Sequence, residues 1–122
     1  MNDLSGEFLV KSVATSDTAS QELLTHYYRN DYNTVKNCVL EVAKQLNYTV
    51  ETVDDRFKEI FLQGAKSHII VNMVNITYYE TALDLTVYTY WTLTKKKAVQ
   101  IVTDFYARCD RKLNFKGKGL TK

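Results

Sequence analysis

Two stretches of the chain carry hydrophobic residues at steps of three and four, the spacing of an amphipathic helix. The first covers residues 33–46 and the second covers residues 95–113. Asp31 or Asn33 can cap the first helix and Thr94 the second, because a short side-chain oxygen accepts a free N–H of the first turn. The expected buried stripes are Val35, Cys38, Val39, Val42, Ala43 and Leu46, and Ala98, Ile101, Val102, Phe105, Cys109 and Leu113.

Between these helices lie four runs rich in β-branched and aromatic residues, which predict strands over residues 48–53, 57–63, 68–78 and 82–93. The connections are short, so neighbouring strands should be antiparallel. In the last run, odd positions from Leu83 to Leu93, including Trp91, are mostly apolar, whereas even positions are polar or tyrosine. In the third run the apolar positions change parity, which predicts a β-bulge near residues 72–75.

The order of these elements predicts an α+β fold, a two-layer sandwich in which an antiparallel meander sheet of four to five strands carries two helices on one face. Each helix has one apolar stripe, which must be buried against the apolar side of the sheet. Residues 21–29 fit either a helix or a strand, with a strand slightly favoured. The expected organisation is a flexible N-terminal arm (1–20), one α+β domain (21–114) and a basic C-terminal tail (115–122).

The composition is that of a folded domain, with 45% hydrophobic and 25% charged residues in a chain of 122. No run approaches the roughly 18 apolar residues that span a bilayer. The first six residues lack the basic start and apolar stretch of a signal peptide. We therefore expect a cytoplasmic protein without membrane contact.

Few residues of this chain suggest metal or catalytic chemistry. Cys38 and Cys109 are the only cysteines, and each lies in an apolar stripe of a predicted helix without a CxxC pair. Reduced, buried thiols are expected, although a disulfide is conceivable if both helices cover the same sheet face. His26 and His68 lie in no nucleophile motif, and the adjacent acids Asp54 and Asp55 are typical of a solvated turn. The sequence thus predicts no metal, no cofactor and no enzymatic activity.

The charge is unevenly distributed along the chain. Residues 1–94 carry 7 basic and 12 acidic side chains (−5), and residues 95–122 carry 9 basic and 2 acidic ones (+7). Lys95, Lys96 and Lys97 occupy the first turn of the closing helix, where the helix dipole disfavours cations. A solvated cluster is the simpler interpretation. The functional interpretation is an anion-binding site or, with the basic tail, a surface for nucleic acid.

Tyr78, Tyr88 and Tyr90 are expected on the sheet face that the helices leave open. Strand propensity alone explains tyrosines among threonines, but tyrosine is also enriched at interfaces because it offers large amphipathic area. Single-stranded RNA modules also present aromatics on a sheet, but their Lys/Arg-Gly-Phe/Tyr signature is missing here. The leading hypothesis is a non-enzymatic domain that binds another protein or itself through these tyrosines. The alternative is anion or nucleic-acid binding through Lys95–Lys97 and the tail.

Overall fold

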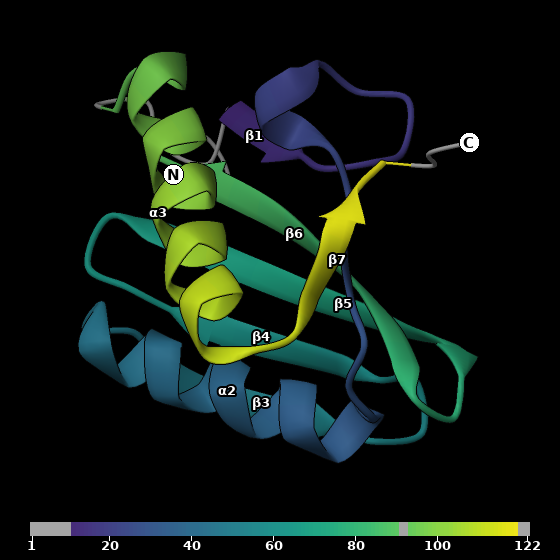
Figure 1. Ribbon diagram of the computed structural model, residues 1–122. Helices are drawn as coiled ribbons and strands as arrows, with labels where there is room; N and C mark the ends of the chain where they lie inside the picture. Colours follow the sequence, from purple (N-terminus) through teal and green to yellow (C-terminus); the bar gives the residue numbers. More distant parts are fainter. Residues whose placement is uncertain (1–10, 91–92, 120–122) are drawn as a thin grey trace.

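The computed structural model describes residues 11–90 and 93–119 and confirms an α+β fold with both long helices on one face of an antiparallel sheet (Figure 1). Within the described residues the sheet has seven strands, more than the four to five expected. The strands are β1 (Lys11–Ala14), β2 (His26–Tyr28), β3 (Thr49–Asp54), β4 (Glu59–Gln63), β5 (Ser67–Thr77), β6 (Glu80–Thr89) and β7 (Phe115–Lys118). The helices are the 3-10 helix η1 (Gln21–Leu23), α2 (Tyr32–Gln45) and α3 (Lys95–Lys112).

The sheet is ordered β3-β4-β5-β6-β2-β7, and β1 also pairs with β6. Strands β3 to β6 form the predicted meander. β1 and β2 share the other edge of β6 end to end, with β1 paired to residues 86–89 and β2 to residues 81–83. β6 is therefore paired along both edges and forms the centre of the sheet.

The additional strands come from segments that were expected to lie outside the domain. β1 belongs to the predicted arm and β7 to the predicted tail, and both pair antiparallel with strands distant in sequence. Each has only four residues, too few for a periodic pattern to appear. Residues 21–29 contain both η1 and β2. Residues 1–10, Trp91, Thr92 and residues 120–122 lie outside the described residues.

The bulge predicted near residues 72–75 corresponds to a one-residue register shift at the end of that range, between Asn75 and Thr77, but this shift does not cause the change of parity. Pairing between β5 and β6 is continuous from Ser67 opposite Thr89 to Asn75 opposite Thr81, and the register shifts only between Asn75 and Thr77. The parity change arises because Val74 and Ile76 are 54% and 48% exposed. They lie on the end of the β5–β6 hairpin, which extends past the helices (Figure 1).

Both helices begin at the predicted caps. The Asp31 carboxylate accepts the Thr34 N–H, and the Thr94 hydroxyl accepts the Lys97 N–H. Asn47, with φ 66°, follows the end of α2 in the left-handed conformation that asparagine tolerates. None of the helices in the described ranges is long and apolar enough to cross a membrane.

The core fills the space between the helices and one face of the sheet. The stripes predicted for α2 and α3 are largely buried, and Tyr106 is buried with them. Their partners on the sheet are alternate residues of the central strands. These are Ile60, Leu62, Ile69, Val71, Met73, Leu83, Leu85 and Val87.

Substituting Gly64→Ala should lower the free energy of unfolding by about 1–3 kcal/mol, because the added Cβ has no room. It would lie 2.6 Å from Cε2 of Tyr48 and 3.1 Å from the Ser67 carbonyl oxygen. The ring cannot move away freely, since the Tyr48 hydroxyl is hydrogen-bonded to Ser67. Urea denaturation measures the effect.

Gly117→Ala is the matched control, because a Cβ at Gly117 meets no atom within 4 Å. It should change the free energy of unfolding by less than about 0.5 kcal/mol. Equal losses in the two variants would contradict the packing assigned to Gly64.

Candidate functional site

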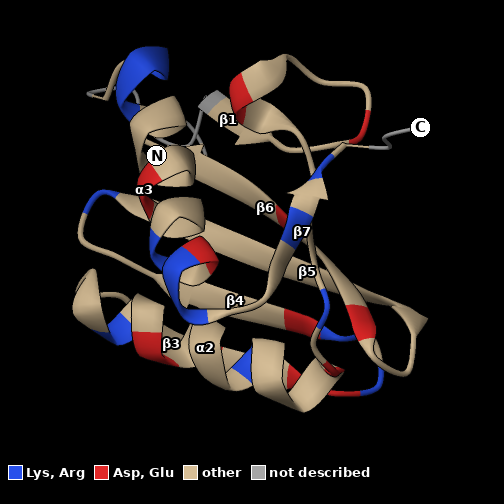
Figure 2. Cartoon of the chain, viewed as in Figure 1, with Lys and Arg blue, Asp and Glu red and all other residues tan. Residues whose placement is uncertain are grey.

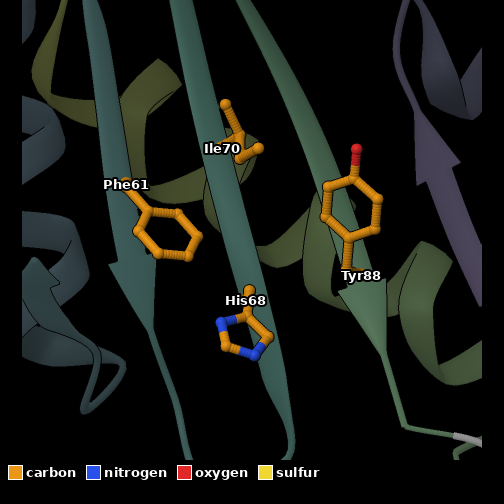
Figure 3. A pocket seen from close by; sticks show the side chains of 4 residues that line it. All are labelled: Phe61, His68, Ile70 and Tyr88. Carbon is orange, nitrogen blue, oxygen red and sulfur yellow. The ribbon is translucent and has the colours of Figure 1, made fainter. Parts of the chain in front are cut away.

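The open face of the sheet carries a cluster of aromatic and aliphatic side chains, which we call the open-face cluster. Its members lie at alternate positions, the described residues next to them in the sequence are buried, and Figure 3 shows four of them side by side on three strands. The cluster consists of Phe61 on β4, His68 and Ile70 on β5, Tyr88 on β6, and Tyr90 just after β6.

Strand pairing fixes the geometry of this cluster. Phe61 is opposite Ile70, and His68 is opposite Tyr88. The rings of Phe61 and His68 are nearly parallel, at 3° with centroids 5.6 Å apart, whereas Tyr90 meets His68 edge-on at 6.1 Å. The backbone ladder holds these side chains in place, so the cluster does not depend on a loop.

Phe61, His68, Ile70 and Tyr88 line a shallow pocket of about 250 Å³. All four side chains are half-buried. His68 Nδ1 is buried and makes no hydrogen bond within the described chain. The exposed walls of the pocket are apolar, so the pocket can receive an apolar side chain.

The structure brings Tyr88 and Tyr90 together but places Tyr78 elsewhere. Tyr78 lies in the two-residue turn between β5 and β6, because Thr77 already pairs with Glu80. It is 70% exposed and packs edge-on against Tyr79, with centroids 4.7 Å apart. The length of β5 separates it from His68 by about 30 Å. Tyr78 is therefore not part of the open-face cluster.

Phe61, His68 and Ile70 were not identified as site residues from the sequence. Apolar side chains occupy both parities of the run around Phe61, so alternation alone does not reveal which of them face outward. One signal was available: Ile60 and Leu62 lie at even positions and Phe61 at an odd one, so Phe61 faces the opposite side of the strand from those two residues. Only the pairing of β4 with β5 shows that Phe61 joins the tyrosine side of the sheet.

Lys95, Lys96 and Lys97 are exposed in the first turn of α3, as predicted. The Thr94 hydroxyl already accepts the N–H of Lys97 at 3.1 Å. Figure 2 shows basic residues at both ends of α3, a helix of 18 residues and so about 27 Å long. The lysine cluster and the basic end of the helix therefore do not form one continuous surface.

Basic residues near the end of the chain are engaged in ion pairs. Lys112 lies 3.1 Å from Glu41, Arg108 lies 3.1 Å from Asp104, and Lys116 lies 2.8 Å from Glu80. Of these three cations, only Lys116 belongs to the basic tail on which the nucleic-acid hypothesis relied, and its pair with Glu80 gives it a structural partner.

A second cluster, made of polar and aromatic side chains, lies between β2 and α3. Oδ1 of Asp110 accepts the Tyr28 hydroxyl at 2.6 Å and lies 3.0 Å from His26 Nδ1. The His26 ring stacks on Tyr106, at 2° and 3.6 Å between centroids. Burial, with a contribution from Asp110, raises the pKa of Tyr28 well above its ordinary value. Tyr28 thus stays a neutral hydrogen-bond donor.

This second cluster fastens β2 to α3. The Tyr106 hydroxyl donates to the Leu83 carbonyl at 2.7 Å, and His26 borders a cavity of about 190 Å³ that Glu22 and Lys118 also line. Thr103 also lines the cavity, but its hydroxyl donates to the Gln100 carbonyl of the same helix at 3.1 Å. We assign the cluster a structural role.

The Asp54–Asp55 pair forms the predicted turn. Oδ1 of Asp54 accepts the N–H groups of Arg56 and Phe57, at 3.0 and 3.1 Å. Hydrogen bonds from Tyr32 and then Lys36 lower the pKa of Asp55 below its ordinary value. Across residues 11–90 and 93–119, no group of three or more His, Cys, Asp or Glu side chains is arranged to hold a metal ion.

No protein-family model and no curated protein matches the chain. Any functional argument therefore depends on the geometry described above.

Substituting Asp110→Ala should lower the free energy of unfolding by about 1–3 kcal/mol, since it leaves the buried Tyr28 hydroxyl without an acceptor. Asp104→Ala is the matched control on the same helix, because it removes a carboxylate from an exposed pair with Arg108. That variant should lose less than about 1 kcal/mol. Urea denaturation at neutral pH measures the free energy of unfolding of both variants. Equal values for the two variants would argue against the role of Asp110 in holding β2 to α3.

Proposed function

We propose that this chain is a non-enzymatic assembly domain that associates with a second copy of itself through the open-face cluster. The observation that carries the proposal is the apolar pocket formed by Phe61, His68, Ile70 and Tyr88 on a sheet face that no described helix covers. Contiguous exposed apolar surface of this kind commonly marks an interface.

The residue types of the cluster suit a protein partner. Tyrosine and phenylalanine bury large areas with few rotatable bonds, and tyrosine keeps a hydroxyl for hydrogen bonding at the rim. Tyr88 forms one wall of the pocket, and Tyr90 extends the aromatic surface beyond His68. An inserted apolar side chain from a partner would bury the pocket and contact the rings of Phe61, His68 and Tyr88.

The charge of the open face favours protein over nucleic acid. Asp54 and Glu59 are cross-strand partners, and Glu59 shares its parity with Phe61, so both carboxylates lie on the open face. A nucleic-acid surface requires cations to replace the counterions of the phosphates. The alternative of anion or nucleic-acid binding through Lys95–Lys97 is therefore less well supported.

A second copy is a simple partner for this surface. Two open faces packed on each other would form a sheet-on-sheet interface with a spacing of about 10 Å. Such an interface is isologous, so a single cluster supplies both sides. The association would convert two two-layer molecules into one four-layer dimer.

Substituting Tyr88→Ala together with Tyr90→Ala should raise the dimer dissociation constant by about tenfold or more, because buried tyrosines are frequent hot spots. Light scattering coupled to gel filtration, over a range of concentrations, measures the oligomeric state. Circular dichroism verifies that the variant keeps its fold.

The matched control is Tyr78→Ala together with Tyr79→Ala, which removes two tyrosines from the exposed turn but leaves the cluster intact. It should dimerise like the unmodified chain. A protein that stays monomeric at every concentration would refute self-association. A monomer that binds a different protein through Tyr88 would show that the face serves a heterologous partner.

A further inference from the structure

Charged side chains lie on the open face at two different places along the strands. Glu59 is opposite Asn72, which is opposite Asp84, so these three residues form one row across β4, β5 and β6. Lys66 comes just before β5, and its carbonyl accepts the Tyr90 N–H at 3.4 Å, which continues the β5–β6 register by one pair. The open-face cluster therefore lies between an acidic row and a lysine.

Lys66 and Glu59 are both exposed, and neither forms an ion pair with any residue that the structure describes. Lys66 is six residues from Asn72, the cross-strand partner of Glu59, so the two charges lie about 20 Å apart along the strands. They cannot meet within one chain. The carboxylate of Asp84 differs, because its Oδ1 already accepts two threonine hydroxyls. Lys66 and Glu59 are the charges that a second copy can contact.

The stacking of two open faces, which rests on the self-association proposed above, can follow three registers. With the strands of both copies parallel, each Lys66 lies over its own counterpart, and Glu59 lies over Asp84 of the other copy. With the strands antiparallel and the faces fully overlapped about Asn72, the two acidic rows coincide. Both arrangements place like charges opposite each other, which is costly at an interface. The third register avoids this.

We propose that two copies stack antiparallel about an axis between His68 and Ile70, so that Lys66 of each copy pairs with Glu59 of the other. Residues equally distant from this axis face each other. Ile70 lies over His68 of the second copy and enters its pocket, and Lys66 lies over Asn72. Glu59 is one strand to the side of Asn72, at about 4.8 Å. The two-fold symmetry forms this ion pair twice.

The angle between stacked sheets is compatible with these contacts. Aligned sheets cross at about 30°, which displaces the strands sideways by about 2 Å at one residue from the axis and by about 5 Å at three residues. Ile70 therefore stays over the pocket. Lys66 is displaced further, but its long and flexible side chain can follow a carboxylate one strand away.

Charge reversal in the full-length chain tests this pairing. Lys66→Glu and Glu59→Lys should each raise the dimer dissociation constant about tenfold, because each variant places like charges at both symmetry-related contacts. An equimolar mixture of the two variants should dimerise as tightly as the unmodified chain, since every contact between unlike copies joins opposite charges. Light scattering, at a concentration where each variant alone is mainly monomeric, should show the average mass rise on mixing.

Lys44→Glu is the matched control for net charge, because Lys44 is exposed on α2, on the other face of the sheet. This variant should keep the dissociation constant of the unmodified chain within about twofold. Circular dichroism verifies that all variants keep their fold. An unmodified chain that stays monomeric would overturn both the self-association and the stacking. A dimer that is unaffected by either charge reversal, or two weakened variants that gain no mass on mixing, would overturn the stacking alone.

Discussion

Strand β6 is the element on which the rest of the structure depends, because two separate strands share one of its edges. Where β1 ends and β2 begins, backbone groups of β6 would lack partners unless side chains supplied them. Oδ1 of Asp84 accepts the hydroxyls of Thr15 and Thr25, both at 2.6 Å. The Leu85 N–H donates to the Thr15 hydroxyl at 2.9 Å, and Tyr106 binds the Leu83 carbonyl from α3. This junction joins α3 to the edge of β6 that β1 and β2 share.

The complete pairing of β6 also determines where function is to be sought. A strand paired on both sides presents its alternate side chains from a stiff backbone, with one parity in the core and the other outward. Tyr88 therefore stands at a fixed position beside His68 and Phe61. The open-face cluster is held by paired strands. The tyrosines of the β5–β6 turn, in contrast, lie on an exposed loop.

The sequence predicted what depends on local periodicity. The helix expected over residues 33–46 is α2, Tyr32–Gln45, and the alternation along residues 82–93 correctly placed Tyr88 opposite the core. β1 and β7 were missed because four residues carry no readable period and their pairing is made with distant strands. Three of the five residues of the open-face cluster were missed for a related reason, since Phe61 joins Tyr88 only through the pairing of three strands.

The position of α3 after the whole β-meander in the sequence has a consequence for how the chain folds during synthesis. β7 follows α3 in the sequence, and β2 precedes both helices. A nascent chain that has emerged only as far as β6 has no α3 to cover Leu83, Leu85 and Val87. The apolar side of the central strand thus stays exposed to other chains until α3 leaves the ribosome, and contacts so distant in sequence form slowly. The period of greatest aggregation risk is therefore the interval between the translation of β6 and that of α3.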